Sequence, residues 1–463
     1  MALTICVGVF GPSRAGKSTL VKALIDNEMD LTSDDARGGP TEALQFALAK
    51  LYKCSSTTDE PCYRSCGCMV DMERQGCDKL GHEMEQMTLS RRVAFVDCPG
   101  HMGYVPTMLK GMMMADGVLI LSRPSSTACF SDPPTLEVLA AADVMGRSIL
   151  VVQSRRDTAS ASQLENHRAQ IRRFTHDMIS SEVPILEVSA RDMSSIRRVC
   201  SHMEKMHVEE PNVFAPALML IGSSCDPLEQ DEEEPTKMCV TICGRVVQGA
   251  LPAAAELDDD DDGNLVEVRP GVVRPGSDGK PECHPIVLRL APGVAAAAAG
   301  DMVALRASTK IISEQGRSVL RGGLEGHVLG PVGSLPDVYG VLKIEFCPLR
   351  KMWDPYTEEL RRVPQIEMNQ ELLLIIGTMS TYGRVRSIDD SSSSDATTSS
   401  NSSSKKKTRK TRISIVVGSL SPPTCARLGE KILICGRLDM SWHLIGSGEI
   451  MAGRSIKVVQ HDN

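Results

Sequence analysis

A phosphate-binding loop stands near the start of the chain and reads Gly11-Pro12-Ser13-Arg14-Ala15-Gly16-Lys17-Ser18-Thr19. It follows an apolar run at 3–10 and precedes a helical pattern at 17–26. Such a loop turns its backbone N–H groups inward onto phosphate oxygens, and the N-terminus of the helix adds partial positive charge. Lys17 is predicted to reach the β- and γ-phosphates, and the Ser18 hydroxyl is predicted to bind Mg²⁺. The strand–loop–helix order predicts a nucleotide site rather than a chance glycine-rich turn.

A second group of reactive residues, Asp97-Cys98-Pro99-Gly100-His101, comes directly after the apolar run at 93–97. Asp97 is predicted to hold Mg²⁺ through water, and the Gly100 amide is predicted to bind the γ-phosphate. The loop then has two states, with and without that phosphate. His101 is a candidate for orienting the attacking water, since positioning is a large part of phosphoryl-transfer catalysis. The alternative for this segment is an ordinary turn.

The elements around these residues indicate more than one domain, as expected for 463 residues. Up to about residue 200, apolar runs alternate with helical patterns, which favours an α/β domain with a largely parallel sheet. From about 210, short β-branched runs between Gly and Pro turns favour β-barrels. Strands are expected at 3–10, 93–97, 117–122, 148–153 and 184–188, and helices at 17–26, 103–114, 133–145, 160–180 and 193–206.

The composition is that of an ordinary globular protein, with 42% apolar and 24% charged residues. No apolar run approaches the roughly 18 residues of a membrane span, and no signal segment opens the chain, so we expect a cytoplasmic protein without a membrane partner. The net charge of −8 excludes a generic nucleic-acid binder. The 16 cysteines are expected to be reduced.

Two low-complexity inserts interrupt the second half of the chain. The first is an acidic run at 258–262, and the second is a Ser-rich and basic stretch at 391–412. Both are interpreted as solvated loop extensions. For the basic part, at 405–412, a nucleic-acid patch or a nuclear signal is the alternative.

With these motifs the chain resembles the translational GTPases, and most closely the gamma subunit of eukaryotic and archaeal initiation factor 2. The resemblance runs over about 3–460, apart from the inserts, and elongation factors share the GTPase motifs but not the other stretches. Those stretches are at 49–54, 62–67, 107–111, 266–271, 328–336 and 444–450.

The resemblance implies an α/β P-loop GTPase domain over 1–208, followed by two all-β barrel domains over 209–318 and 319–463. It implies a GTP-dependent carrier of initiator methionyl-tRNA to the small ribosomal subunit. The gamma subunit would be the core of a heterotrimer, with the alpha subunit on the second domain and the beta subunit on the GTPase domain. No arginine finger is evident in the motifs, so hydrolysis is expected to be slow without an activating partner, and GDP release is expected to use an exchange factor.

The guanine-reading motif departs from the family pattern. Where the family has Asn-Lys-x-Asp, this chain has Ser154-Arg155-Arg156-Asp157. Asp157 would accept hydrogen bonds from guanine N1 and the exocyclic amine, and Arg155 would replace Lys as a stacking plane. Ser189-Ala190 matches the last base-contacting motif and favours guanine. The alternative is a loop that no longer reads guanine.

The switch I segment also departs from the family. The spacing from 50–54 places Thr41 where the family has its Mg²⁺-binding threonine, although the neighbours of Thr41 differ. A helix cap next to Glu42 is the alternative.

The Cys-rich knuckle at 54–77 is a candidate zinc site. Cys54, Cys62 and Cys66 match family positions, and the second cysteine of the usual four is absent. Cys68 or Cys77 would then supply the fourth thiolate of a tetrahedral site. A reduced, metal-free loop is the alternative.

Two other functions are compatible with these departures. One is a non-hydrolysing scaffold paralogue that keeps the trimer interfaces, and the other is an elongation-type factor for a specialised tRNA. No basic platform with interleaved aromatics is visible, so tRNA recognition would use the groove between the GTPase domain and the second barrel.

Overall fold

A computed structural model describes the structure of most residues of the chain. These are 4–25, 42–55, 61–68, 72–74, 77, 86–124, 133–179, 182–228, 237–253, 264–292, 294–310, 319–320, 323–354, 357, 359–389, 412–438 and 441–459. Thr41, the acidic insert at 258–262 and residues 391–411 of the second insert, which include all of its basic part except Arg412, lie outside them.

The N-terminal part is built on one mixed sheet with the strand order β3-β2-β4-β1-β5-β6-β7. Its strands are β1 (Thr4–Phe10), β2 (Gln45–Cys54), β3 (Tyr63–Gly67), β4 (Met87–Asp97), β5 (Gly117–Ser122), β6 (Ser148–Gln153) and β7 (Ile185–Glu187). From β4 to β7 the pairs are parallel, and β2 and β3 join as antiparallel strands. Every residue of β1 is buried, as expected for a parallel strand that is covered on both faces.

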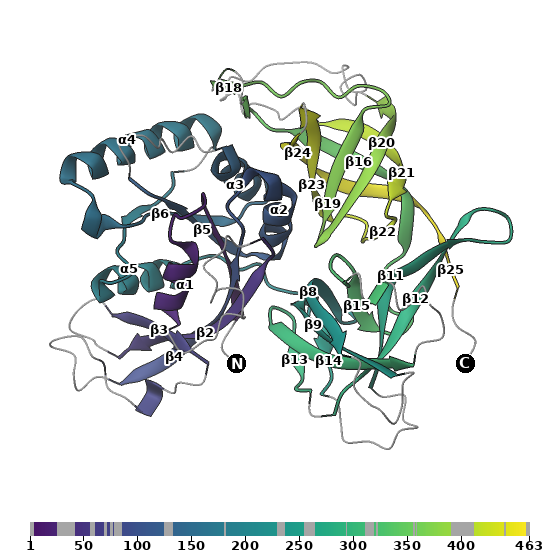
Figure 1. The fold of residues 1–463 in the computed structure, drawn as a ribbon, viewed down its shortest axis with the longest axis horizontal. Coiled ribbons are helices and arrows are strands. Elements are labelled where there is room, and N and C mark those ends of the chain that lie inside the picture. The colour runs from purple at the N-terminus through teal and green to yellow at the C-terminus, as the bar shows by residue number, and fades with distance from the viewer. Residues whose placement is uncertain are drawn as a thin grey trace, which may run out of the picture.

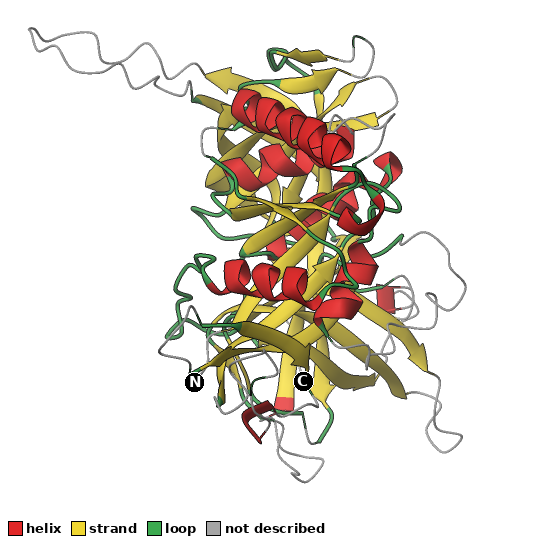
Figure 2. Cartoon of the chain, turned by 90° about the vertical axis from the view of Figure 1, so that its left-hand side faces the viewer, coloured by secondary structure: helices red, strands yellow, loops and turns green. Residues whose placement is uncertain are grey.

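Helices cover both faces of this sheet (Figures 1 and 2). The helices are α1 (Lys17–Leu24), α2 (Val105–Met114), α3 (Pro133–Val144), α4 (Ala161–Met178) and α5 (Met193–Glu204). Apolar residues of α1 and α5 pack on one face, and those of α2, α3 and α4 belong to the core on the other. The predicted α/β GTPase-type domain is confirmed. The prediction missed β2 and β3, and it gave only the last part of β4.

The second part of the chain forms a closed barrel. Its ring runs β11-β15-β8-β9-β14-β12 and closes through the β11–β12 pair. The strands are β8 (Leu218–Leu228), β9 (Lys237–Gln248), β11 (Leu265–Pro275), β12 (Pro281–Leu290), β14 (Met302–Lys310) and β15 (Val328–Pro331). β15 lies beyond residue 318, where the sequence analysis ends this domain, and the short β25 (Lys457–Val458) near the C-terminus adds to β12.

The third part forms another closed barrel. Its ring runs β21-β20-β19-β23-β24-β16 and closes through the β16–β21 pair. The strands are β16 (Val338–Pro348), β19 (Glu371–Ile376), β20 (Met379–Asp389), β21 (Ile413–Ser421), β23 (Lys431–Leu438) and β24 (Ser441–Ser455). Small strands complete the described part of the chain: β10 (Ala250–Leu251), β13 (Ala297–Ala298), β17 (Met352–Asp354), β18 (Glu359–Arg361) and β22 (Thr424–Cys425). The two predicted barrels are confirmed.

A buried ion pair and a buried hydrogen bond join the GTPase domain to the two barrels. The Arg245 guanidinium on β9 donates to both carboxylate oxygens of Asp116, at 2.8 and 2.7 Å, and also to the Met114 carbonyl. Glu137 on α3 contacts Nδ1 of His443 at 2.7 Å and accepts from the backbone N–H of Leu444. The three parts therefore meet along polar contacts that are sealed from water. No described helix is long and apolar enough to cross a membrane.

Candidate functional site

The phosphate loop connects the end of β1 to the start of α1. Gly11 has a φ of +137°, and a Cβ there would lie 2.2 Å from the Leu121 carbonyl oxygen, so only glycine fits. Gly16 has a φ of +94° and precedes the helix. Lys17 is buried, and its ammonium donates to the carbonyls of Gly11 at 3.0 Å and Pro12 at 3.2 Å. The loop thus holds its lysine on its inner side.

The segment after β4 lies against this loop. The Ser18 hydroxyl donates to Asp97 at 2.5 Å, and the backbone N–H of Ser13 donates to the Gly100 carbonyl at 3.1 Å. A Cβ at Gly100 would lie 2.5 Å from both the Gly11 carbonyl oxygen and the Lys17 Nζ. The structure therefore brings four predicted residues, Lys17, Ser18, Asp97 and Gly100, into one cluster.

His101 is exposed at the beginning of the turn that leads into α2. Its Nδ1 accepts a hydrogen bond from the Gly103 backbone at 3.2 Å, and its ring meets Tyr104 edge-on at 6.2 Å between centroids. Through Nδ1 the imidazole caps this turn, while Nε2 has no hydrogen bond to a described residue. Thr41, the other predicted switch residue, lies outside the described residues.

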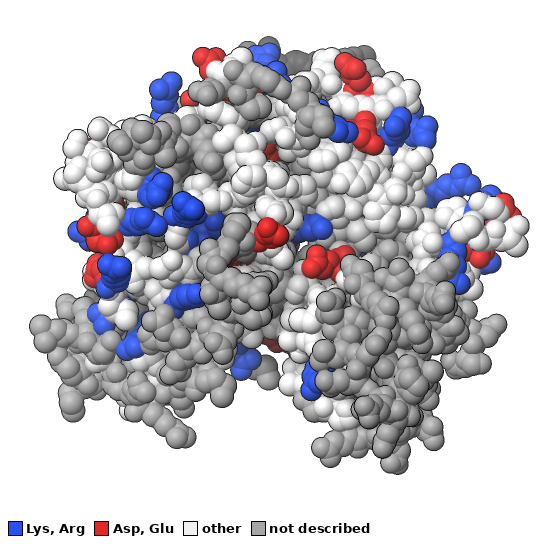
Figure 3. Space-filling view, viewed as in Figure 1, with Lys and Arg blue, Asp and Glu red and all other residues white. Residues whose placement is uncertain are grey.

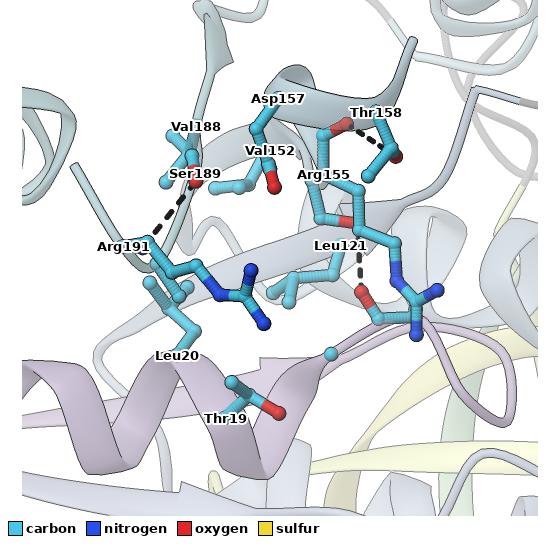
Figure 4. Close-up of a pocket in the computed structure, with 14 residues that line it drawn as sticks. Thr19, Leu20, Leu121, Val152, Arg155, Asp157, Thr158, Val188, Ser189 and Arg191 are labelled. Atoms are coloured by element: carbon cyan, nitrogen blue, oxygen red, sulfur yellow. Dashed lines mark hydrogen bonds between the residues drawn. The ribbon is translucent and has the colours of Figure 1, made fainter.

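A cavity of about 300 Å³ lies beside the phosphate loop (Figure 4). Two loops wall it, one following β6 and the other following β7, and the beginning of α1 forms its floor. The lining residues are Ala15, Gly16, Thr19, Leu20, Leu121, Val152, Ser154, Arg155, Asp157, Thr158, Val188, Ser189, Ala190 and Arg191. All five residues predicted to contact the base, at 154, 155, 157, 189 and 190, are among them.

Ser154 connects the cavity to the phosphate loop. Its hydroxyl donates to the Ala15 carbonyl at 2.7 Å and is 3.3 Å from the Ser122 carbonyl, which also accepts from the Ser154 backbone N–H at 2.9 Å. The shorter side chain that stands in place of the family asparagine therefore still braces this loop.

Two arginines extend into the cavity from opposite sides. In Figure 4, Arg155 and Arg191 flank the space below Asp157. Both are exposed, and among the described residues neither guanidinium forms an ion pair. Arg155 has a φ of +57°, a left-handed conformation that is uncommon outside glycine. The sequence analysis missed Arg191, although its place directly after Ser189-Ala190 was the available signal.

A network of charges fixes the two base loops to each other. Glu187, at the end of β7, pairs with Arg168 at 2.7 Å and Arg156 at 3.7 Å, and Arg156 also reaches Asp192 at 4.0 Å. The hydroxyls of Ser195 and Ser194 lower the pKa of Asp192 to about 2. Figure 3 shows many further Lys and Arg side chains on the left of the view, over the GTPase domain. Arg156 therefore pairs with carboxylates at the end of β7 and in the loop after it, whereas its neighbour Arg155 forms no ion pair with a described residue.

A buried histidine supports the same region from behind. Gln153 Nε2 donates to His167 Nδ1 at 3.0 Å, so the proton of the neutral ring is on Nε2, which is 2.9 Å from the Ser122 hydroxyl. Burial lowers the pKa of His167 to about 4. The imidazole is therefore neutral near pH 7.

A separate cluster of thiols lies at the far end of the β2–β3 pair. The sulfur atoms of Cys54, Cys62 and Cys77 lie within 4.8 Å of one another, and those of Cys62 and Cys77 are 3.0 Å apart. Burial and the neighbouring thiols raise the pKa of Cys62. Cys66 is buried in the same apolar cluster but is not in this group of three, and Cys68 is exposed outside it.

This geometry agrees with the comparisons with known proteins. The Elongation factor Tu GTP binding domain family matches residues 3–210. Eukaryotic translation initiation factor 2 subunit 3 of Drosophila melanogaster is 30% identical, over 98% of this chain and 90% of that protein. Eukaryotic translation initiation factor 2 subunit gamma of Schizosaccharomyces pombe is 29% identical, over 98% of this chain and 95% of that protein.

A solved structure supports the arrangement of the three parts. Translation elongation factor SelB from Methanococcus maripaludis, in complex with the GTP analogue GppNHp, aligns with a TM-score of 0.64. The alignment covers 99% of this chain and 82% of that chain at 13% identity, so it concerns the fold alone. Together with the relative that shares 30% identity over nearly the whole chain, the phosphate loop and the base cavity lead to one assignment. The chain belongs to the gamma-subunit family of translation initiation factor 2 and is a GTP-binding, GTP-hydrolysing member of it.

Proposed function

We propose that this chain carries initiator methionyl-tRNA to the small ribosomal subunit in its GTP-bound state and releases it after hydrolysis. It would do so in the cytoplasm as the core of a heterotrimer with alpha and beta subunits. The observation that carries the proposal is the base cavity, which opens beside the phosphate loop of a domain that is joined to both barrels. A nucleotide bound there is positioned to control how the three parts are arranged.

In this proposal the phosphate side binds the nucleotide through Lys17 and holds Mg²⁺ through Ser18 and Asp97. Hydroxyl and carboxylate oxygens are the ligands that Mg²⁺ prefers, and the 2.5 Å contact between these two side chains supports a shared ion. The ion, when bound, would neutralise charge on the β- and γ-phosphates. Thr41 stays a predicted further ligand.

The γ-phosphate signal would pass through α2. In this proposal the amides of Ser13 and Gly100 turn to the γ-phosphate, so the hydrogen bond from Ser13 to the Gly100 carbonyl would break when GTP binds. α2 follows this segment, packs against β8 of the second barrel and β19 of the third, and ends at Met114, whose carbonyl accepts from Arg245. A shift of α2 would therefore act on both barrels and on the tRNA groove beside them.

On the base side, Asp157 would read guanine by accepting from N1 and the exocyclic amine. The guanidinium groups of Arg155 and Arg191 would cover the two faces of the base, since guanidinium planes stack on π-systems. Ser189-Ala190 would contact the edge of the base. His101 would orient the hydrolytic water through Nε2, with an activating partner needed for fast turnover and an exchange factor for GDP release.

The first test of this function is a titration with labelled GTP, GDP and ATP in the presence of Mg²⁺. We expect a clear preference for the guanine nucleotides. Indifference between GTP and ATP would support a scaffold that no longer reads the base.

The tRNA proposal needs a separate binding assay. Initiator methionyl-tRNA should bind the heterotrimer more tightly with GTP than with GDP, and elongator methionyl-tRNA should bind weakly in both states. Preference for another aminoacyl-tRNA would support the elongation-type alternative. Co-purification with alpha and beta subunits tests the heterotrimer.

We also propose that the thiol cluster binds zinc through Cys54, Cys62 and Cys77. Thiolate sulfurs around tetrahedral zinc are about 3.8 Å apart, given Zn–S bonds of about 2.3 Å. The three sulfur atoms of the cluster lie within 4.8 Å of one another, and those of Cys62 and Cys77 are 3.0 Å apart, so a small adjustment would place them around one ion. Zinc would also explain why buried thiols gather here, because a bound metal holds them in the deprotonated form.

The zinc proposal is tested by metal analysis of purified variants. Cys77→Ser should lower bound zinc strongly, whereas Cys68→Ser, at an exposed position outside the group, serves as the matched control. Equal zinc loss in the Cys68→Ser variant would restore Cys68 as the fourth ligand. Zinc content unchanged by Cys77→Ser would remove Cys77 from the site.

A further inference from the structure

One charged side chain of the phosphate loop has no assigned role in holding the nucleotide. Arg14 is exposed, and within the described residues its guanidinium forms no ion pair and no hydrogen bond. It is the fourth residue of the loop. Ser13, whose N–H donates to the Gly100 carbonyl, precedes it, and Gly16, the residue before α1, lies two positions after it. Arg14 therefore adds a second cation, after Lys17, to a loop that is predicted to bind phosphate.

The backbone at Arg14 makes the presence of a side chain costly. Its φ is +64°, and for a residue with a Cβ the left-handed conformation costs roughly 1–2 kcal/mol. The hydrogen bond from the Ala15 N–H to the Pro12 carbonyl, at 3.2 Å, closes a tight turn with Arg14 at its corner. A glycine at this position would avoid the conformational cost. The Arg14 guanidinium forms no ion pair or hydrogen bond with a described residue that would offset it. The side chain therefore fits a role that depends on a ligand.

Hydrolysis of GTP creates negative charge next to this turn. A water oxygen forms a bond to the γ-phosphorus, and the bond from that phosphorus to the β–γ bridging oxygen breaks. GDP leaves with the electron pair, and the water protons end on phosphate or solvent. Charge accumulates on the bridging oxygen, where a positioned cation lowers the barrier. Lys17, which donates to the carbonyls of Gly11 and Pro12 in this structure, is assigned to binding the β- and γ-phosphates, and this leaves Arg14 as the second cation of the loop for the charge on the bridging oxygen.

We propose that Arg14 is a catalytic residue, an arginine finger supplied by the phosphate loop itself. Once the γ-phosphate has displaced the Gly100 carbonyl from the Ser13 amide, the guanidinium donates N–H groups to the bridging oxygen and to the γ-phosphate. Its planar fork can contact both oxygens at once, which a lysine ammonium cannot match. The inference rests on GTP binding at this loop, and it gives the chain a hydrolytic cation of its own.

Single-turnover GTP hydrolysis at saturating enzyme separates this role from binding. Arg14→Gly suits the left-handed backbone and is expected to fold, while it slows hydrolysis by about a hundredfold or more and leaves the GDP affinity within about threefold. Arg14→Lys should retain an intermediate rate. Arg173→Ala removes an exposed arginine from α4 and should hydrolyse GTP at the unaltered rate.

A transition-state mimic gives a second readout. Aluminium fluoride should slow GDP release from the unaltered protein and from Arg173→Ala, but not from Arg14→Gly. An unchanged hydrolysis rate in Arg14→Gly would overturn the proposal, as would a rate and a GDP affinity that fall by the same factor. Absence of guanine-nucleotide binding in the unaltered protein would overturn the proposed function as well, whereas normal binding with an unaffected variant would overturn only the arginine finger.

Discussion

The base half and the phosphate half of the nucleotide site differ in what their polar groups contact. On the base side, the loops are braced from behind by Ser154, His167 and Glu187, and an open cavity of about 300 Å³ remains between them. On the phosphate side, the groups that would bind phosphate and metal contact one another, as in the Ser13–Gly100 and Ser18–Asp97 hydrogen bonds. The base site is preformed, whereas the polar groups of the phosphate site form hydrogen bonds with one another.

The phosphate half therefore acts as the switch, and the base half reads the nucleotide. A braced cavity reads the base with little rearrangement, so it contributes specificity in either nucleotide state. A phosphate loop that bonds to its own switch segment has to exchange those bonds for bonds to the ligand, which couples binding to movement.

Removal of the phosphate-side cation should have the largest effect. Lys17→Ala is expected to abolish measurable GTP and GDP binding, because the base cavity alone cannot offset the repulsion of unneutralised phosphates. The same titration on Lys22→Ala, five residues further along α1, provides the control, and circular dichroism checks the fold. Unchanged affinity in Lys17→Ala would mean that the phosphate half is not where the nucleotide binds.

Substitution of Asp157, the residue proposed to read the base, should change the nucleotide specificity more than it changes the response of the switch to the γ-phosphate. Asp157→Asn removes a carboxylate that accepts two hydrogen bonds, each worth about 1.5–3 kcal/mol for a charged partner, so GTP affinity should fall about a hundredfold or more. Xanthosine triphosphate, which carries a carbonyl where guanine has its amine, should bind this variant better than GTP does. Equal losses for both nucleotides in competition titrations would argue against Asp157 as the base reader.

Acid should loosen the base half through His167. Its pKa is about 4 in the folded protein and near 6.5 in the unfolded chain, so between these values only the unfolded chain takes up the proton. Below pH 6.5 this group therefore lowers the free energy of unfolding, by up to about 3 kcal/mol near pH 4.

Urea unfolding from pH 7 to pH 4.5, compared with His167→Gln, isolates that contribution from the other titrating groups. The variant should lose less stability over this range than the unaltered protein. Parallel pH profiles would show that the imidazole does not brace the loop.

The smallest expected effect comes from the contact that joins the two halves. Ser154→Ala removes the 2.7 Å hydrogen bond to the Ala15 carbonyl, a bond worth about 1 kcal/mol, and should weaken GDP and GTP binding alike by about fivefold. Stopped-flow dissociation rates are the sensitive measurement. A loss restricted to GTP would indicate that Ser154 belongs to the switch rather than to the brace.

The residues that could be predicted from the sequence are those whose roles depend on local backbone geometry. The phosphate loop encodes its own turn through Gly11 and Gly16, and Asp97 and Gly100 follow the end of a buried strand, so their cluster could be anticipated from parallel-sheet topology. The guanine loop was placed for the same reason, because β6 and β7 end at the same edge of the sheet as β1.

What the sequence did not reveal depends on tertiary packing. Arg191 follows a recognised motif but acquires its place as a cavity wall only through the fold of the opposite loop. Either Cys68 or Cys77 could supply a further thiol on the sequence alone, and only the three-dimensional structure shows that Cys77 lies with Cys54 and Cys62. The Arg245–Asp116 pair joins residues 129 positions apart, and no local pattern predicts it.

The shared core has a consequence for any attempt to shorten the chain. Apolar residues of α2 and α3 belong to one cluster with Leu373, Leu433 and Leu444 of the third barrel. A fragment that ended near residue 208 would expose this helical face to water and leave Asp116 and Glu137 without their partners from the barrels. We expect such a fragment to self-associate even with its nucleotide loops intact, so the GTPase domain depends on its barrels for solubility as well as for signalling.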